Sequence, residues 1–134
     1  MRKKAANFTK PVFEALCVHG IMNIADIESY FEQAIPSSYK EFLSGHTKEM
    51  EGDVYLYLLQ DLIERNDCYE TKTYANGYIN IGDNGGGEAF IIALGSDDPE
   101  VSIVGHGSMD PTLKEFVCSS FSRWVASGFE YDNE

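Results

Sequence analysis

Two short apolar segments joined by a glycine-rich stretch constrain the fold more than any other feature of the sequence. Tyr78–Ile81 alternates apolar and polar residues, as a half-buried strand does, and Ala89–Leu94 is continuously apolar, which favours a central strand. Gly82–Gly87 between them has the length of a hairpin connection, so the two strands are expected to be antiparallel. Such a turn needs several positive φ angles, which glycine adopts without a steric clash.

Helical and strand-like segments flank this hairpin on both sides. Asn23 is a favourable N-cap for a helix that Pro36 would end. Ser38 and Glu41 have the spacing of a capping box at the start of a further helix. This further helix is predicted over residues 37–44. The other predicted elements before the C-terminal region are a helix over residues 9–19, a strand over 54–59, a helical turn over 59–66 and a strand over 101–104.

The last predicted element is a C-terminal amphipathic helix. Asp110-Pro111 has the pattern of a cap followed by a first-turn proline, and Gly128 would close the helix. Its apolar stripe at helical spacing consists of Leu113, Phe116, Val117, Phe121, Trp124 and Val125. The order of elements predicts a single α+β domain over residues 1–134, with a mainly antiparallel sheet of about four or more strands, packed by N-terminal helices and by this C-terminal helix.

The charge of the chain excludes two classes of partner. Ten Lys and Arg residues face 22 Asp and Glu residues, so the net charge is -12. A chain with this balance has no electrostatic footprint for nucleic acid or for an anionic membrane. The stretch from Thr73 to Leu113 holds no Lys or Arg at all. Two explanations stay open: solubility through self-repulsion, and an acidic face for a basic protein partner.

The cysteines and the apolar segments indicate a cytoplasmic protein. Cys17, Cys68 and Cys118 are odd in number and form no C-x-x-C spacing, so neither a disulfide framework nor a thiolate zinc site is expected. The basic N-terminus is not followed by the continuous apolar region of a signal peptide. No segment approaches the ~20 apolar residues that span a bilayer.

No pattern of catalytic or metal-ligating residues emerges. The histidines, His19, His46 and His106, are not paired at ligand spacing, and no G-x-S-x-G elbow is present. His106 lies between Gly105 and Gly107 and is expected to be a turn residue rather than a general base. We therefore expect no catalytic residues, no metal and no cofactor.

The glycine-rich turn does not fit a nucleotide-binding loop. Asn84 stands where a G-x-G-x-x-G motif requires its second glycine, and Glu88 stands where a P-loop requires lysine. A carboxylate at that position would repel the phosphates. An apolar strand also follows, whereas both motifs are followed by a helix.

Three segments of the chain carry recognisable motifs: IPSSYKEFL over residues 35–43, YINIGDNGGGEAF over 78–90 and FSRWV over 121–125. They are similar, in this order, to a helix opening, a strand–glycine turn–strand element and a terminal helix of one known family. The chain thus resembles the SUKH superfamily, which comprises fungal cell-wall-synthesis regulators of the Smi–Knr type and many bacterial relatives. The resemblance covers about residues 23–128, and it departs from the family at 44–49, where an Asn-Gly-Gly-type turn is usual.

The resemblance implies a non-enzymatic protein-binding role. Bacterial members are typically immunity proteins that neutralise polymorphic toxins, often nucleases, so the expected partner is a cognate toxin or another basic protein. The alternative is an intracellular regulatory or scaffold module, and an enzyme acting on a small molecule comes third. The partner, the binding face and the oligomeric state stay open. The residues expected near the binding face are Asp53, Asp83, Asn84, Glu88, Asp97, Asp98 and Glu100.

Overall fold

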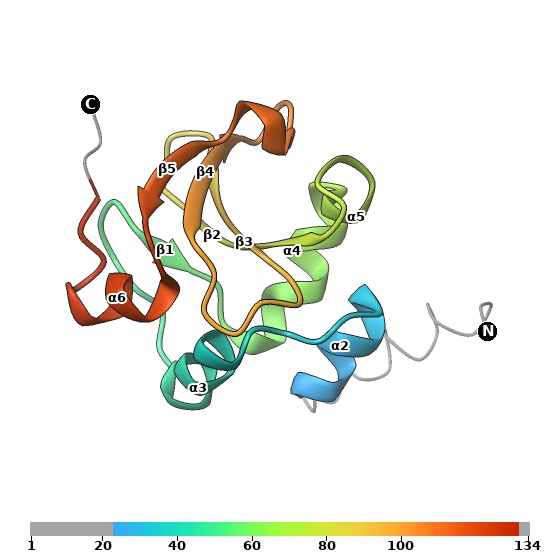
Figure 1. Cartoon of the computed structure of the whole chain (residues 1–134), viewed down its shortest axis with the longest axis horizontal. Coiled ribbons are helices and arrows are strands. Elements are labelled where there is room, and N and C mark those ends of the chain that lie inside the picture. Colours follow the sequence, from blue (N-terminus) through green and yellow to red (C-terminus); the bar gives the residue numbers. More distant parts are fainter. Residues whose placement is uncertain (1–22, 132–134) are drawn as a thin grey trace.

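The computed structural model describes residues 23–131 (Figure 1). The helix predicted over residues 9–19 and the basic N-terminus, with Cys17 and His19, lie outside the described residues. Within residues 23–131, no helix is both long enough and apolar enough to cross a membrane.

A five-stranded antiparallel sheet forms the centre of the fold, with the strands in chain order from one edge to the other. The prediction of an α+β fold with a mainly antiparallel sheet is confirmed, and β3 is the central strand, as its continuous apolar run predicted. The strands are β1 (Tyr55–Leu56), β2 (Tyr78–Asp83), β3 (Glu88–Ala93), β4 (Val101–Gly105) and β5 (Glu115–Cys118).

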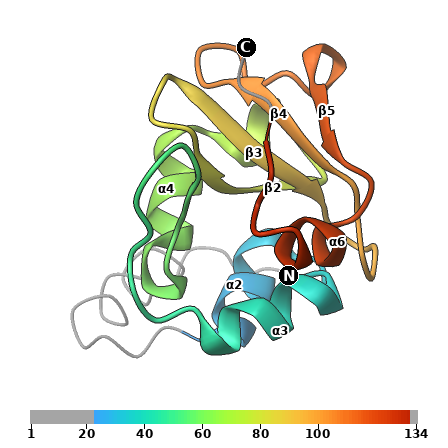
Figure 2. The same cartoon turned by 90° about the vertical axis from the view of Figure 1, so that its left-hand side faces the viewer.

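Short helices surround the sheet. Figure 2 shows α2, α3 and α6 together below the sheet, with α4 beside it. The helices are α2 (Ile24–Phe31), α3 (Ser37–Gly45), α4 (Leu62–Cys68), α5 (Thr71–Tyr74) and α6 (Phe121–Ala126), with the 3-10 turns η2 (Leu59–Asp61) and η3 (Pro111–Leu113). The predicted helical turn after β1 is confirmed as η2 and α4, whereas α5 was not predicted.

The prediction of one long C-terminal helix is wrong in its first half. Asp110 does cap a helical turn, since its carboxylate accepts the Thr112 amide at 3.0 Å, but the turn ends at Leu113. The chain then forms β5, which pairs with β4 and leaves Phe116 65% exposed. An i, i+3, i+4 stripe that is not buried lacks the packing that stabilises a helix. Ser120 starts the true helix by accepting the Arg123 amide.

Two of the predicted helix boundaries also differ. Asn23 and Asp26 form the expected capping box, but α2 ends at Phe31, before Pro36. At α3 the predicted Ser38 cap is wrong, because Pro36 occupies the N-cap position and makes no side-chain cap. The Ser38 amide instead donates to the Asp97 carbonyl at 3.0 Å, so a tertiary contact replaces the local cap.

Two apolar clusters cover the two faces of the sheet. The larger cluster lies between the sheet and the helices α2, α3 and α6, and its largest buried side chains include Trp124, Tyr39 and Phe90. The smaller cluster packs Ala89, Ile91 and Val104 against Ala75 and Met109 on the other face. The sheet is therefore fixed from both sides, which makes its loops defined positions for side chains.

The buried side chain of Asn66 joins α4 to the sheet through two hydrogen bonds to the backbone of Asn80. The Asn66 Oδ1 accepts the backbone amide of Asn80 at 2.8 Å, and the Asn66 Nδ2 donates to the Asn80 carbonyl at 3.0 Å. Both residues have no exposed surface. Because Asn66 supplies one donor and one acceptor to the same strand residue, it fixes the position of α4 along β2.

Candidate functional site

The β2–β3 hairpin holds three of the predicted site residues in one rigid turn. Asp83 Oδ1 accepts the Gly85 amide at 3.0 Å, and Asn84 Oδ1 accepts the Gly86 amide at 2.9 Å. Asn84 Nδ2 donates to Glu88 Oε1 at 2.9 Å, which closes the turn. Gly85 and Gly87 have φ angles of 77° and 93°, so the expectation of positive φ in this turn is met at these two glycines.

Gly82 is required for a different reason, namely the close approach of β1. A Cβ at this position would overlap the Tyr55 carbonyl oxygen and lie 2.9 Å from the Cα of Leu56. Gly82 and Leu56 are directly paired between β1 and β2. No side chain fits there without separating the two strands.

We predict that Gly82→Ala lowers the free energy of unfolding by about 1–3 kcal/mol, the usual cost of overpacking a rigid site. Gly86→Ala is the matched control, because its Cβ would lie 3.5 Å from the nearest atom, Asn84 Oδ1, an ordinary contact. The control should change the free energy of unfolding by less than about 0.5 kcal/mol. Urea titration monitored by circular dichroism measures both; equal effects would contradict the role assigned to Gly82.

Asp83 is also tied to the core by Tyr57. The buried Tyr57 hydroxyl donates to Asp83 Oδ2 at 2.9 Å. Burial and the adjacent carboxylate raise the pKa of the Tyr57 phenol well above its ordinary value, so the hydroxyl stays protonated and keeps donating. The carboxylate of Asp83 is therefore held in place by neutral donors.

Sequence reasoning missed the aromatic and basic side chains near Tyr57, the residue that holds this carboxylate, and near the turn that follows β4. The Arg65 guanidinium lies over the Tyr57 ring at 5.4 Å, and the Tyr69 ring stacks on His106 with centroids 3.8 Å apart. Burial lowers the pKa of His106, with Asp83 acting against this and Arg65 adding to it. His106 does lie in a turn, as predicted, and its amide donates to the Gly87 carbonyl at 2.8 Å.

Asp53 lies at the same end of the sheet as the hairpin. It is exposed and precedes β1, whose first residue, Tyr55, is paired with Asp83. Glu49 and Glu51, in the same loop, are also exposed, and the Tyr55 hydroxyl donates to Glu49 at 3.4 Å. We call the group Asp53, Asp83, Asn84 and Glu88 the hairpin-end group.

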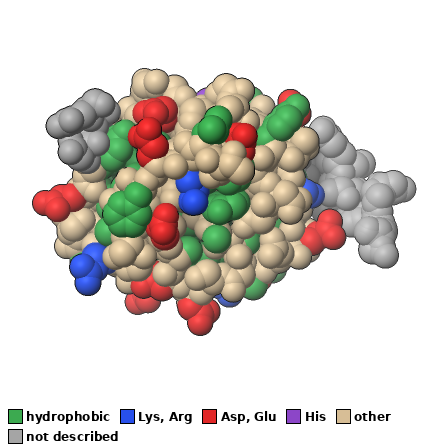
Figure 3. All heavy atoms as spheres, turned by 45° about the horizontal axis from the view of Figure 1, so that its top comes forward, with side chains coloured by type: hydrophobic (Ala, Val, Ile, Leu, Met, Phe, Trp, Pro, Cys, Tyr) green, Lys and Arg blue, Asp and Glu red, His purple; other side chains and the backbone are tan. Residues whose placement is uncertain are grey.

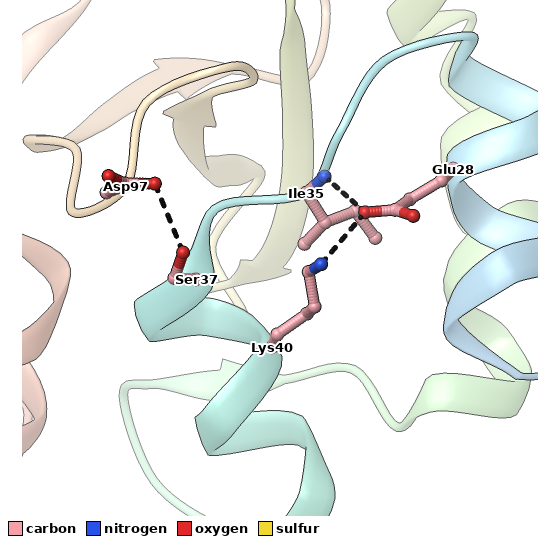
Figure 4. A network of polar contacts seen from close by, with 5 residues as sticks. All are labelled: Glu28, Ile35, Ser37, Lys40 and Asp97. Atoms are coloured by element: carbon pink, nitrogen blue, oxygen red, sulfur yellow. Dashed lines mark hydrogen bonds and ion pairs between the residues drawn. The ribbon is translucent and has the colours of Figure 1, made fainter.

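The other three predicted residues lie at the opposite end of β3, and we call Asp97, Asp98 and Glu100 the β3–β4 turn group. The hairpin precedes β3 and this turn follows it, so the two groups are separated by the length of the six-residue strand, about 20 Å. Asp97 accepts the Ser37 hydroxyl at 3.1 Å beside α3 (Figure 4), and Glu100 accepts the Ser102 hydroxyl at 3.0 Å. The structure does not bring the predicted residues together in one group.

Asp98 holds the start of α6. Its carboxylate accepts the Ser122 amide at 2.9 Å and the Ser122 hydroxyl at 2.5 Å. Burial acts to raise the pKa of Asp98, but the hydrogen bonds from Ser122, with those from Ser38 and Ser120, outweigh it and hold the pKa below the ordinary value of an aspartate. Asp98 therefore has a structural role, whichever partner the turn meets.

We predict that Asp98→Asn lowers the free energy of unfolding by about 1 kcal/mol at pH 7, the usual cost of weakening a helix cap. Because folding depresses this pKa, the contribution is present above the unfolded value and is lost as the pH falls through the folded one. The difference between the variant and the wild type should close as the pH falls through the lowered pKa of Asp98. Urea titrations at neutral and acidic pH measure it, and a difference that persists in acid would contradict the assignment.

No Lys or Arg in the described part of the chain forms an ion pair with a carboxylate of the hairpin-end group or of the β3–β4 turn group. Among residues 23–131 the only ion pair joins Lys40 to Glu28 at 3.3 Å (Figure 4). The Ile35 amide and Lys40 together lower the pKa of Glu28, against the effect of burial. Within the same part of the chain, no group of His, Cys, Asp and Glu side chains is arranged to hold a metal ion.

The chain matches the model of the SMI1 / KNR4 family (SUKH-1) over residues 22–127. The match contains all of the sheet, the hairpin-end group and the β3–β4 turn group. No curated protein matches the chain.

Proposed function

Because the chain belongs to the SMI1 / KNR4 family (SUKH-1), whose members are generally protein-binding domains, we propose that it neutralises a cognate polymorphic toxin by binding it. The binding is non-enzymatic and takes place in the cytoplasm. The toxin is basic at its contact surface, as a nuclease is. The binding face is the hairpin end of the sheet.

The observation that carries this proposal is a set of fixed carboxylates without basic neighbours at ion-pair distance. Asp83 and Glu88 are held by Tyr57, Gly85 and Asn84, which are all neutral donors. Among the described residues, no Lys or Arg forms an ion pair with either carboxylate. Their charge is therefore available to a cationic partner, and their positions are set before the partner arrives, which lowers the entropy cost of binding.

The charge of the chain fits the chemistry of a nuclease. A nuclease presents Lys and Arg to phosphate groups, so a carboxylate surface can occupy the same groove and exclude the substrate. The net charge of -12 also steers a basic partner toward the chain and speeds association at low salt. The β3–β4 turn group contributes to this steering, although two of its carboxylates also hold the helices α3 and α6.

The alternative is a regulatory or scaffold module that binds a protein or peptide which is not a toxin. The same carboxylates and the same family membership support it, so the partner's identity separates the two functions. An enzyme acting on a small molecule is the third hypothesis, and a ligand that raises the melting temperature would be its signature.

Co-purification from the native host tests the proposal. The tagged chain is expected to retain a basic protein encoded beside its own gene, and that protein alone should be toxic when expressed. The purified chain should then inhibit the activity of the toxin at a 1:1 ratio. A retained partner without toxicity supports the regulatory alternative, and the absence of any stoichiometric partner contradicts both.

A further inference from the structure

The two edges of the sheet differ in whether they can accept another strand. At the β1 edge, the outward Leu56 carbonyl is occupied by His46 Nε2 at 2.8 Å, and the strand is only two residues long. At the other edge, β5 pairs with β4 alone, and within residues 23–131 no strand lies on its outer side. An open edge strand offers unpaired backbone donors and acceptors to another chain.

Exposed apolar side chains gather at this open edge. Phe116 is 65% exposed in the middle of β5, and Leu113 is 64% exposed just before the strand. Figure 3 shows hydrophobic side chains with acidic and basic ones between them on the side of the molecule that carries β5 and η3. The edge therefore offers both backbone hydrogen bonds and apolar contact, which together give affinity in strand addition.

The two faces of β5 specify different side chains for an added strand. Phe116 is opposite Ser102, on the face of the smaller cluster, whereas Glu115 is opposite Ile103, on the face of the larger one. Glu115 is exposed, and no Lys or Arg among the described residues forms an ion pair with it. A strand beside β5 would place an apolar residue next to Phe116 and gain most from a basic residue next to Glu115.

We propose that β5 binds an extended segment of another protein in which apolar and basic residues alternate. This surface is separate from the hairpin-end group, and the proposal does not depend on toxin neutralisation. A second copy of the chain fits less well, because two chains of net charge -12 repel each other and both would place Glu115 at the junction.

The probe is a synthetic eight-residue peptide in which Val and Lys alternate. The peptide is titrated into the full chain, and nuclear magnetic resonance records the amide shifts of the chain. Amide shifts at Glu115–Cys118 should saturate with peptide concentration. A control peptide with the same residues, but N-methylated at alternate amides, keeps the charge and loses the donors, and should bind at least tenfold more weakly. Equal binding of the two peptides, or shifts only at the hairpin-end carboxylates, would overturn the proposal.

Variants of the exposed residues complete the test. Phe116→Ala should weaken peptide binding about tenfold, and Glu115→Lys should shift the preference to a peptide alternating Val and Glu. Because both side chains are exposed, neither change should alter the melting temperature. Sedimentation measures self-association in parallel, and a wild-type dimer that Phe116→Lys dissociates would make the occupant a second copy and overturn the proposal.

Discussion

Trp124→Ala is expected to lower the free energy of unfolding by about 3–5 kcal/mol, a large part of the stability of a domain of this size. The Trp124 ring is completely buried between Phe90 of β3, 5.0 Å away, and Phe129 after α6, 5.2 Å away. Its indole N–H donates to the Glu130 carbonyl at 2.9 Å. Removing the ring leaves a cavity in the larger cluster and an unpaired carbonyl beside it.

The loss of stability in Trp124→Ala should extend to the hairpin end of the sheet. Tyr131 follows the segment that Trp124 anchors, and its hydroxyl accepts from Asn84 Nδ2 at 3.1 Å. Chemical unfolding measures the stability, and amide exchange at the hairpin measures the local effect. Phe116→Ala is the control, because it also removes an aromatic ring but from a side chain 65% exposed, and it should cost little. A similarly small decrease in the free energy of unfolding for Trp124→Ala would contradict the packing described.

Neutralising the hairpin-end carboxylates should weaken partner binding about 100-fold, or ~2.8 kcal/mol. The variant carries Asp53→Asn, Asp83→Asn and Glu88→Gln, which remove the charge and keep the size of each side chain and one of its two acceptor oxygens. Calorimetric titration against the toxin measures the dissociation constant. The effect arises because the basic groups of the partner still lose their hydrating water on binding, but no longer meet a carboxylate that compensates for it.

A second triple variant separates location from net charge. Asp97→Asn, Asp98→Asn and Glu100→Gln also remove three carboxylates, so both variants change the net charge from -12 to -9. We expect the β3–β4 turn variant to slow association modestly through weaker steering and to leave dissociation unchanged. If it instead weakens binding as much as the hairpin-end variant, the assignment of the binding face is contradicted.

The local features of the fold were predictable from the sequence. The glycine turn between two short apolar segments correctly predicted the β2–β3 hairpin, and Asn23 correctly predicted the start of α2, because both depend on residues close together in the chain. The C-terminal region was not predictable in this way. Phe116 and Val117 fit a helical stripe as well as a strand, and only pairing with β4 decides between the two.

The candidate site was predictable only in part, for the same reason. Acidic turn residues are visible in the sequence, and Asp83, Asn84 and Glu88 do share one turn. Tyr57 is 26 positions away from Asp83, so its hydrogen bond to that carboxylate depends on tertiary structure. The separation of the two acidic groups at opposite ends of β3 likewise follows from the strand order.

Hydrogen exchange of the complex with the toxin tests most directly whether the partner binds at the hairpin end. The account predicts that binding slows the exchange of amides in residues 83–88 and in the loop before β1, while residues 97–100 exchange at the rate of the free chain. Slower exchange confined to residues 97–100, with the hairpin unchanged, would contradict the central claim.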